Sequence, residues 1–115
     1  MSIEYNKKKL LGLFDKVHIM SEDIGEVEYL IFLGENRTFS LYMLPLEEYA
    51  SLMLINTDKK NWLFEIEIKR LEKIICEEDT LKFYKNDNTE KPALTVKIKP
   101  EISLWCRAET PRKED

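Results

Sequence analysis

Paired carboxylates are the residues of this 115-residue chain whose spacing best suits chemistry. Glu26 and Glu28 alternate with apolar residues in one segment, and Glu65 and Glu67 do so in another. Residues two apart share one face of a strand, and close carboxylates can serve acid–base catalysis or ligate a cation through oxygen. The four would meet only if their two strands were neighbours. The plainer interpretation is a solvated sheet face, on which Glu65 and Glu67 are candidate binding residues.

His18 is the only conventional proton shuttle in the chain. A small enzyme using His18 with a glutamate is the less favoured alternative, because the chain contains no Gly-x-Ser-x-Gly element and no glycine-rich phosphate loop. Cys76 and Cys106 lie among apolar residues, which is typical of reduced core thiols, and their separation does not match a zinc site. We expect no catalytic residue, no metal and no cofactor.

A second group of candidate residues is basic. Lys82 and Tyr84 lie in one apolar-alternating segment and Lys97 and Lys99 in another, and all four take the side opposite the apolar residues. Such a face could bind nucleic acid or a phosphorylated ligand, or dock an acidic partner. Lysine is also the usual solvent-side residue of a sheet, and a net charge of −4 does not favour a dedicated nucleic-acid binder.

Trp105 stands apart from its apolar neighbours. Leu104 and Cys106 fall on one face of the last predicted strand and Trp105 on the other. The indole could cover a helix, or it could be an exposed anchor of the kind that dominates interfaces. It is kept as a candidate binding residue.

These candidates need a sheet to position them. Period-two alternation and turn residues predict eight short strands, and the pairing of 81–83 with 94–98 follows from their facing apolar residues. The predicted strands are 17–20, 26–33, 38–43, 62–69, 71–76, 81–83, 94–98 and 102–106, and a helical turn is the alternative for 71–76. The fold class is α+β, with a mainly antiparallel sheet of about seven or eight strands that is curved or closed into a partial barrel.

Two helices complete the predicted fold. An apolar stripe that ends at Phe14, with Ser2 as its N-cap, predicts a helix over about 3–14. Residues 50–55 could form a strand, but a helix over about 46–55 fits as well. The helix is preferred because Leu46, Ala50 and Leu54 share a helical stripe, and because proline and two glutamates occupy its predicted first turn.

Composition limits the classes of protein to which the chain can belong. The length and the 43% hydrophobic content predict a single globular domain over 1–106, and 107–115 is almost wholly polar and predicts a disordered tail. No apolar run approaches a membrane span, so we expect a cytoplasmic protein. The lysine-rich, glycine-poor composition is typical of an AT-rich bacterial or phage genome.

Charge is segregated along the chain, with a net −8 over residues 21–79 and +3 over 80–99. This pattern, without a catalytic signature, favours a small non-catalytic binding or regulatory protein that acts by protein–protein contact, as immunity proteins and phage inhibitors do. The alternative is a sheet-face binder of nucleic acid or a phosphorylated ligand. The oligomeric state stays open.

Overall fold

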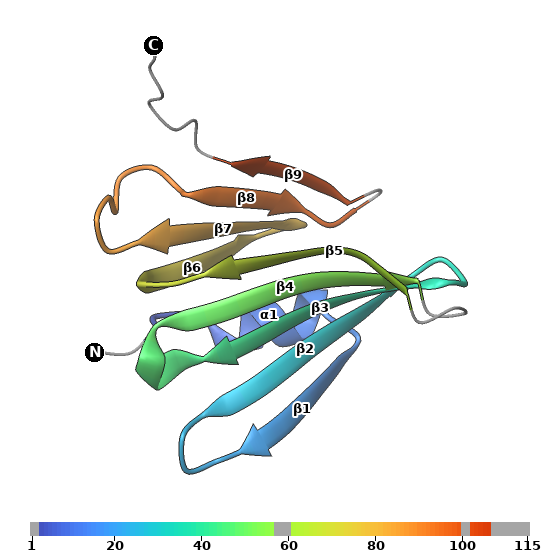
Figure 1. The fold of residues 1–115 in the computed structure, drawn as a ribbon, viewed down its shortest axis with the longest axis horizontal. Helices are drawn as coiled ribbons and strands as arrows, with labels where there is room; N and C mark the ends of the chain where they lie inside the picture. The colour runs from blue at the N-terminus through green and yellow to red at the C-terminus, as the bar shows by residue number, and fades with distance from the viewer. Residues whose placement is uncertain (1–2, 57–60, 100–101, 107–115) are drawn as a thin grey trace.

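Apolar residues at alternate positions build nine strands in the computed structural model, which describes residues 3–56, 61–99 and 102–106. The strands form two antiparallel sheets of five and four strands, and both contribute to one cluster of buried hydrophobic residues. A short N-terminal helix packs against strands of both sheets (Figure 1). The α+β class and the mainly antiparallel sheet that the sequence predicts are therefore confirmed.

The five-stranded sheet follows chain order, so each strand pairs with the strand that follows it. Its members are β1 (Lys16–Ser21), β2 (Glu26–Leu33), β3 (Arg37–Leu44), β4 (Tyr49–Asn56) and β5 (Asn61–Ile68). The register places Val27 opposite Met43 and Met43 opposite Ala50, and all three are buried. Because side chains alternate along a strand, every second residue lies on the face turned away from this core. That outer face carries the candidate site.

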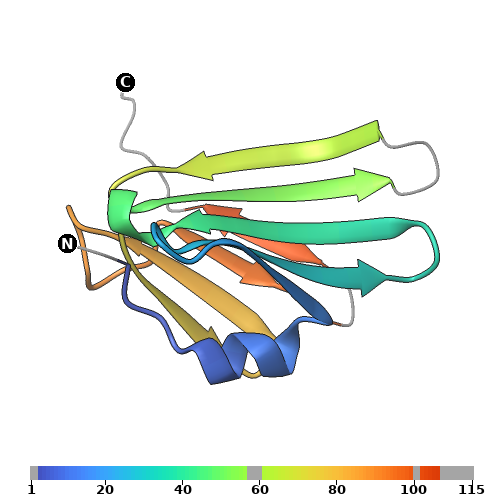
Figure 2. The same cartoon turned by 90° about the horizontal axis from the view of Figure 1, so that it is seen from below.

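The four-stranded sheet packs against the inner face of the first. Its members are β6 (Leu71–Glu77), β7 (Thr80–Lys85), β8 (Leu94–Lys97) and β9 (Ser103–Cys106). Leu81 lies opposite Val96 and Phe83 opposite Leu94, which confirms the predicted pairing of these segments. Arg70, in the left-handed region with φ 55, lies between β5 and β6 where the chain passes from one sheet to the other. The strands of the two sheets run at an angle to one another (Figure 2).

The helix α1 (Lys7–Leu13) begins later than the sequence predicts. Asn6 is its N-cap, and the Asn6 side chain accepts a backbone N–H of the first turn at 3.1 Å. The predicted start at residue 3 is wrong because this segment instead pairs with β6, where Glu4 donates its N–H to the Glu72 carbonyl at 2.9 Å. Ser2, the predicted cap, lies outside the described residues.

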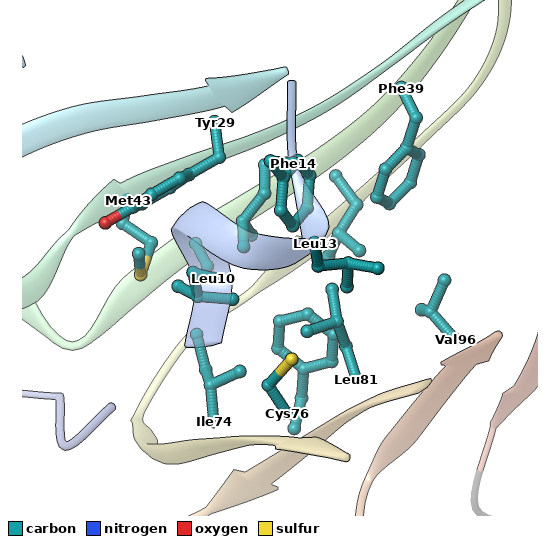
Figure 3. Close-up of a cluster of buried hydrophobic side chains, with 14 of the residues drawn as sticks. Leu10, Leu13, Phe14, Tyr29, Phe39, Met43, Ile74, Cys76, Leu81 and Val96 are labelled. Carbon is teal, nitrogen blue, oxygen red and sulfur yellow. The ribbon is translucent and has the colours of Figure 1, made fainter. Parts of the chain in front are cut away.

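The core is filled by α1 and by the inner faces of both sheets (Figure 3). Phe14, just after α1, has its ring centroid 6.2 Å from that of Phe39 and 5.7 Å from that of Tyr29. Ile74, Leu81 and other side chains of the four-stranded sheet pack from the opposite side. The short helix thus closes the core between the sheets.

The predicted helix over 46–55 is wrong, because these residues form a short 3-10 turn at Pro45–Glu47 and then β4. Glu48 takes the left-handed conformation, with φ 55, and ends the turn. Ala50 and Leu54 then point to the core at alternate positions, while Met53 lies on the other face. Because the outer face of this strand also carries apolar residues, the segment has apolar residues at the three- and four-residue spacing that is typical of a helix. Pairing with β3 and β5 on both sides stabilises it as a strand.

The same error accounts for the strand count. Each of the eight predicted strands corresponds to one strand of the structure, within a residue or two at either end. The remaining strand, β4, is the one that was predicted as a helix. The predicted tail, 107–115, lies outside the described residues. No helix in the described part of the chain is long and apolar enough to cross a membrane.

The two cysteines differ in their surroundings. Cys76 is buried in the core, as predicted, and its thiol donates to the Lys9 carbonyl at 3.7 Å. Cys106 is exposed at the end of β9, so the prediction of a core thiol there is wrong. The strand ends at this position, where the described part of the chain provides no layer to cover it.

Thiol labelling tests this difference. In the folded chain we expect one thiol, that of Cys106, to react rapidly with Ellman's reagent. Cys76 should react only as the chain unfolds, because burial raises the pKa of its thiol and blocks access. Cys106→Ser should remove the fast phase and leave the slow one. Two equally fast thiols in the unmodified chain would contradict the structure.

Candidate binding surface

The outer face of the five-stranded sheet is not covered by any described element (Figure 1). Two cross-strand rows run over it. The first row contains His18, Glu28, Tyr42, Ser51 and Glu67, one from each strand in order. The second contains Lys16, Leu30, Ser40, Met53 and Glu65. Glutamates from β2 and β5 therefore lie on one face, at opposite sides of the sheet.

Hydroxyl groups on the two strands between them contact these carboxylates. On the β2 side, the Ser40 hydroxyl donates to Glu28 Oε2 at 2.7 Å, and the Tyr42 phenol donates to Glu26 Oε2. On the β5 side, the corresponding bonds are Tyr49 to Glu67 Oε2 at 2.8 Å and Ser51 to Glu65 Oε2 at 3.4 Å. We call the four glutamates with these four hydroxyl residues the acidic face.

The condition under which the four glutamates would meet is not fulfilled. β2 and β5 are not neighbours, and β3 and β4 separate them. The tyrosines and serines that donate to the glutamates were not predicted as site residues. Ser40 and Tyr42 alternate with core residues, and this pattern could have placed them on the outer face. Tyr49 and Ser51 could not be placed there, because their segment was predicted as a helix.

The surroundings of the two phenols raise the pKa of both. The bond to Glu26 is the main cause that raises the pKa of Tyr42 to about 12. Burial, followed by the bond to Glu67, raises the pKa of Tyr49. The two rings meet nearly edge to face, with centroids 6.4 Å apart. Both phenols are protonated at neutral pH and donate to Glu26 and Glu67.

Replacing Glu26 with glutamine tests this network. The pKa of Tyr42 should fall from about 12 towards its ordinary 10.0, while Glu28→Gln should leave it high. A pKa raised on folding stabilises the fold below pH 10, and that stabilisation is lost as the pH rises from about 10 to about 12. Titration of ¹³Cζ-labelled tyrosine by NMR resolves the residue. A Tyr42 that titrates near 10.0 in the unmodified chain would contradict the bond.

The same outer face becomes apolar towards its other end. The side chain of Phe32 is 54% exposed and that of Leu63 is 46% exposed. Met53 and Ile55 lie half-buried beside them. The face therefore combines fixed carboxylates with aromatic and apolar side chains.

His18 lies at the edge of this face and is exposed. Its Nδ1 is 3.8 Å from Glu28 Oε1. It does not line any of the described hollows, and no described group of histidine, cysteine and acidic residues could hold a metal ion.

The predicted basic residues lie mainly on the outer face of the four-stranded sheet. Lys82 and Tyr84 point outward from β7, and Lys97 lies on the same face at the end of β8. Lys99 is separate, because it lines a small hollow beside α1 together with Asp79. The structure therefore brings three of the four together.

Neighbouring side chains already contact Lys82 and Tyr84, which would bind the phosphate and stack on the base of a nucleic acid. Glu77 Oε1 lies 2.9 Å from the Lys82 ammonium, and this bond raises the pKa of Lys82 and lowers that of Glu77. The Lys73 ammonium lies 5.0 Å from the centre of the Tyr84 ring. Neither the charge of Lys82 nor this face of the Tyr84 ring is fully available to a ligand.

Trp105 lies on the same outer face of β9, opposite Thr95. Its side chain is 55% exposed, and no described helix covers it. The interpretation in which the indole covers a helix is therefore wrong for the described residues, and Trp105 is an exposed side chain.

Comparison of the chain with family models, with curated proteins and with solved structures finds no match to any of them.

Proposed function

We propose that this chain is a non-catalytic binding protein that docks a basic protein partner on the outer face of its five-stranded sheet. The observation that carries the proposal is the acidic face, where four glutamates of β2 and β5 are joined to hydroxyl donors on β3 and β4. Carboxylates held in place in the free protein lose little side-chain entropy when they meet a cation. An isolated surface glutamate lacks this advantage.

The residue types around the acidic face also support a protein interface. Tyrosine, phenylalanine and methionine are enriched at interfaces, and Tyr42, Tyr49, Phe32 and Met53 all lie on the outer face of the five-stranded sheet. A solvated face would need only the glutamates. The paired carboxylates give charge complementarity to lysine and arginine, and this speeds association and selects the partner.

Differential capture tests the proposal. The full chain is immobilised, and the Glu65→Lys/Glu67→Lys variant serves as the matched matrix for a lysate of the source cell. We expect a basic protein that is retained by the unmodified chain, released by raised salt and absent from the variant. Retention of the same proteins by both matrices would contradict the proposal.

A second candidate function, binding of single-stranded nucleic acid, is favoured by the exposed Trp105 on a sheet face that also carries Lys97. It predicts that a thymidine oligonucleotide quenches the fluorescence of Trp105 at low salt. The quenching should weaken as salt rises and disappear in Lys97→Glu. Trp105→Phe identifies the signal of this tryptophan. No quenching at low salt would remove this candidate.

A further inference from the structure

A groove with a volume of about 770 Å³ lies between α1, the β1–β2 hairpin and the turn at Pro45. Figure 2 views the molecule from the side on which α1 and β1 lie. The groove is lined by the core-facing side chains Val17, Val27 and Tyr29, and Leu11, Ile19 and Leu46 also line it. It is thus bounded mainly by the inner side of the sheet, whereas the hydroxyl–carboxylate bonds of the acidic face lie on the outer side, and Glu26 at the rim belongs to both.

Exposed apolar side chains gather around this groove. Ile19 is 64% exposed, and Leu11 and Leu46 are exposed as well, although all three belong to the lining. Met20 and Ile24 add exposed apolar surface on the adjoining hairpin. A concentration of this kind, set in a concave surface, is characteristic of an interaction site.

The groove runs beside the free edge of the five-stranded sheet. β1 pairs with β2 alone, and no other described strand lies along it. One row of its backbone N–H and C=O groups is therefore open to a further strand, which is the arrangement used when an extended peptide adds to a sheet edge. Side chains of an added strand would alternate between the groove and the outer surface.

The charges at the groove specify the occupant. Glu4, Glu22, Asp23 and Glu26 line it, against a single cation, that of Lys7. We propose that the groove binds an extended segment of a partner protein, with apolar side chains at alternate positions and lysine or arginine at its flanks, as a sixth strand beside β1. A second copy of this chain would bring its own acidic residues to the same rim.

The test is selection from a random peptide library displayed on phage against the full chain, followed by measurement with the enriched peptide made synthetically. We expect apolar residues at every second position between basic flanks. Ile19→Ser should weaken the binding of the peptide by about 10-fold or more, because it removes an exposed apolar side chain that the peptide would bury. Ile75→Ser is the matched control, since it makes the same substitution on the outer face of the four-stranded sheet, where Ile75 lies opposite Lys82, and it should leave the affinity unchanged.

A second measurement tests the strand pairing. Methylation of alternate backbone nitrogens of the peptide keeps its charge and side chains but removes its N–H donors, and it should abolish binding. Chemical-shift changes on binding should centre on residues 16–21. Binding that survives methylation, or that is insensitive to Ile19→Ser, would overturn the inference.

Two further outcomes separate this inference from the proposed function. A peptide whose shifts map to Tyr42 and Tyr49 would support the outer face and overturn the groove. A dimer in light scattering that Ile19→Ser dissociates would make a second copy the occupant, and it would also overturn the inference. Glu65 and Glu67 do not line the groove, so the Glu65→Lys/Glu67→Lys variant should still bind the peptide even if it no longer captures the partner.

Discussion

Phe39→Ala should lower the free energy of unfolding by about 3–5 kcal/mol, a large share of the roughly 5–15 kcal/mol that stabilises a domain. The side chain of Phe39 is 0% exposed and lies at the centre of the fold on β3, stacked on the ring of Phe14. Its removal opens a cavity that neighbours in two sheets and one helix cannot all move to fill. Urea denaturation measures the loss as a lower midpoint with an unchanged slope.

Phe32→Ala is the matched control for this prediction. Phe32 lies on the neighbouring strand, opposite Thr38, but its side chain is on the outer face. The same truncation there should cost no more than about 1 kcal/mol, because little apolar surface returns to water. Equal losses in the two variants would show that the inner and outer faces of the sheet have been assigned wrongly.

Glu65→Lys with Glu67→Lys should weaken the binding of the captured partner by about 100-fold or more. Each substitution replaces a carboxylate with a cation that faces the partner's own cations, and like charges in contact cost several kcal/mol. Tyr49 and Ser51 also lose their acceptors. Both glutamates are exposed, so the fold should tolerate the change. Isothermal titration calorimetry with the purified partner measures the affinity.

A control with the same net charge separates location from total charge. Glu72→Lys with Glu90→Lys also brings the formal net charge from −4 to zero, and both residues are exposed away from the acidic face. This variant should retain affinity within a few-fold at physiological salt, because distant charges are screened. An equal loss in both double variants would mean that net charge alone attracts the partner.

The fold was largely predictable because alternation is a local signal. Eight of the nine strands were expected from the sequence, and the failure at β4 has a clear cause. Ala50 and Leu54 fit the core-facing positions of a strand and also a helical stripe, and only the pairing with β3 and β5 decides between them. That pairing is tertiary information. The predicted helix start at residue 3 was wrong for the same reason, because Glu4 pairs with Lys73 of β6, which lies nearly 70 positions away.

The candidate surfaces were predictable only in part. Glu65 and Glu67 were expected on a solvated face, but their hydrogen bonds to Tyr49 and Ser51 of β4 were not, because that segment was predicted as a helix. Lys99 was expected beside Lys97, yet it follows the end of β8 and lies beside α1. The groove could not be predicted, because Leu11, Ile19 and Leu46 come from three separate segments.

Hydroxyl-radical footprinting of the free chain and of its complex with the captured partner tests the central claim most directly. Tyr42, Tyr49 and Phe32 report on the outer face of the five-stranded sheet, and Tyr84 and Trp105 report on the outer face of the other sheet. We predict that the partner slows oxidation of the first three and leaves Tyr84 and Trp105 unchanged. Protection of Trp105 and Tyr84 with no change at Tyr42, Tyr49 and Phe32 would contradict the account.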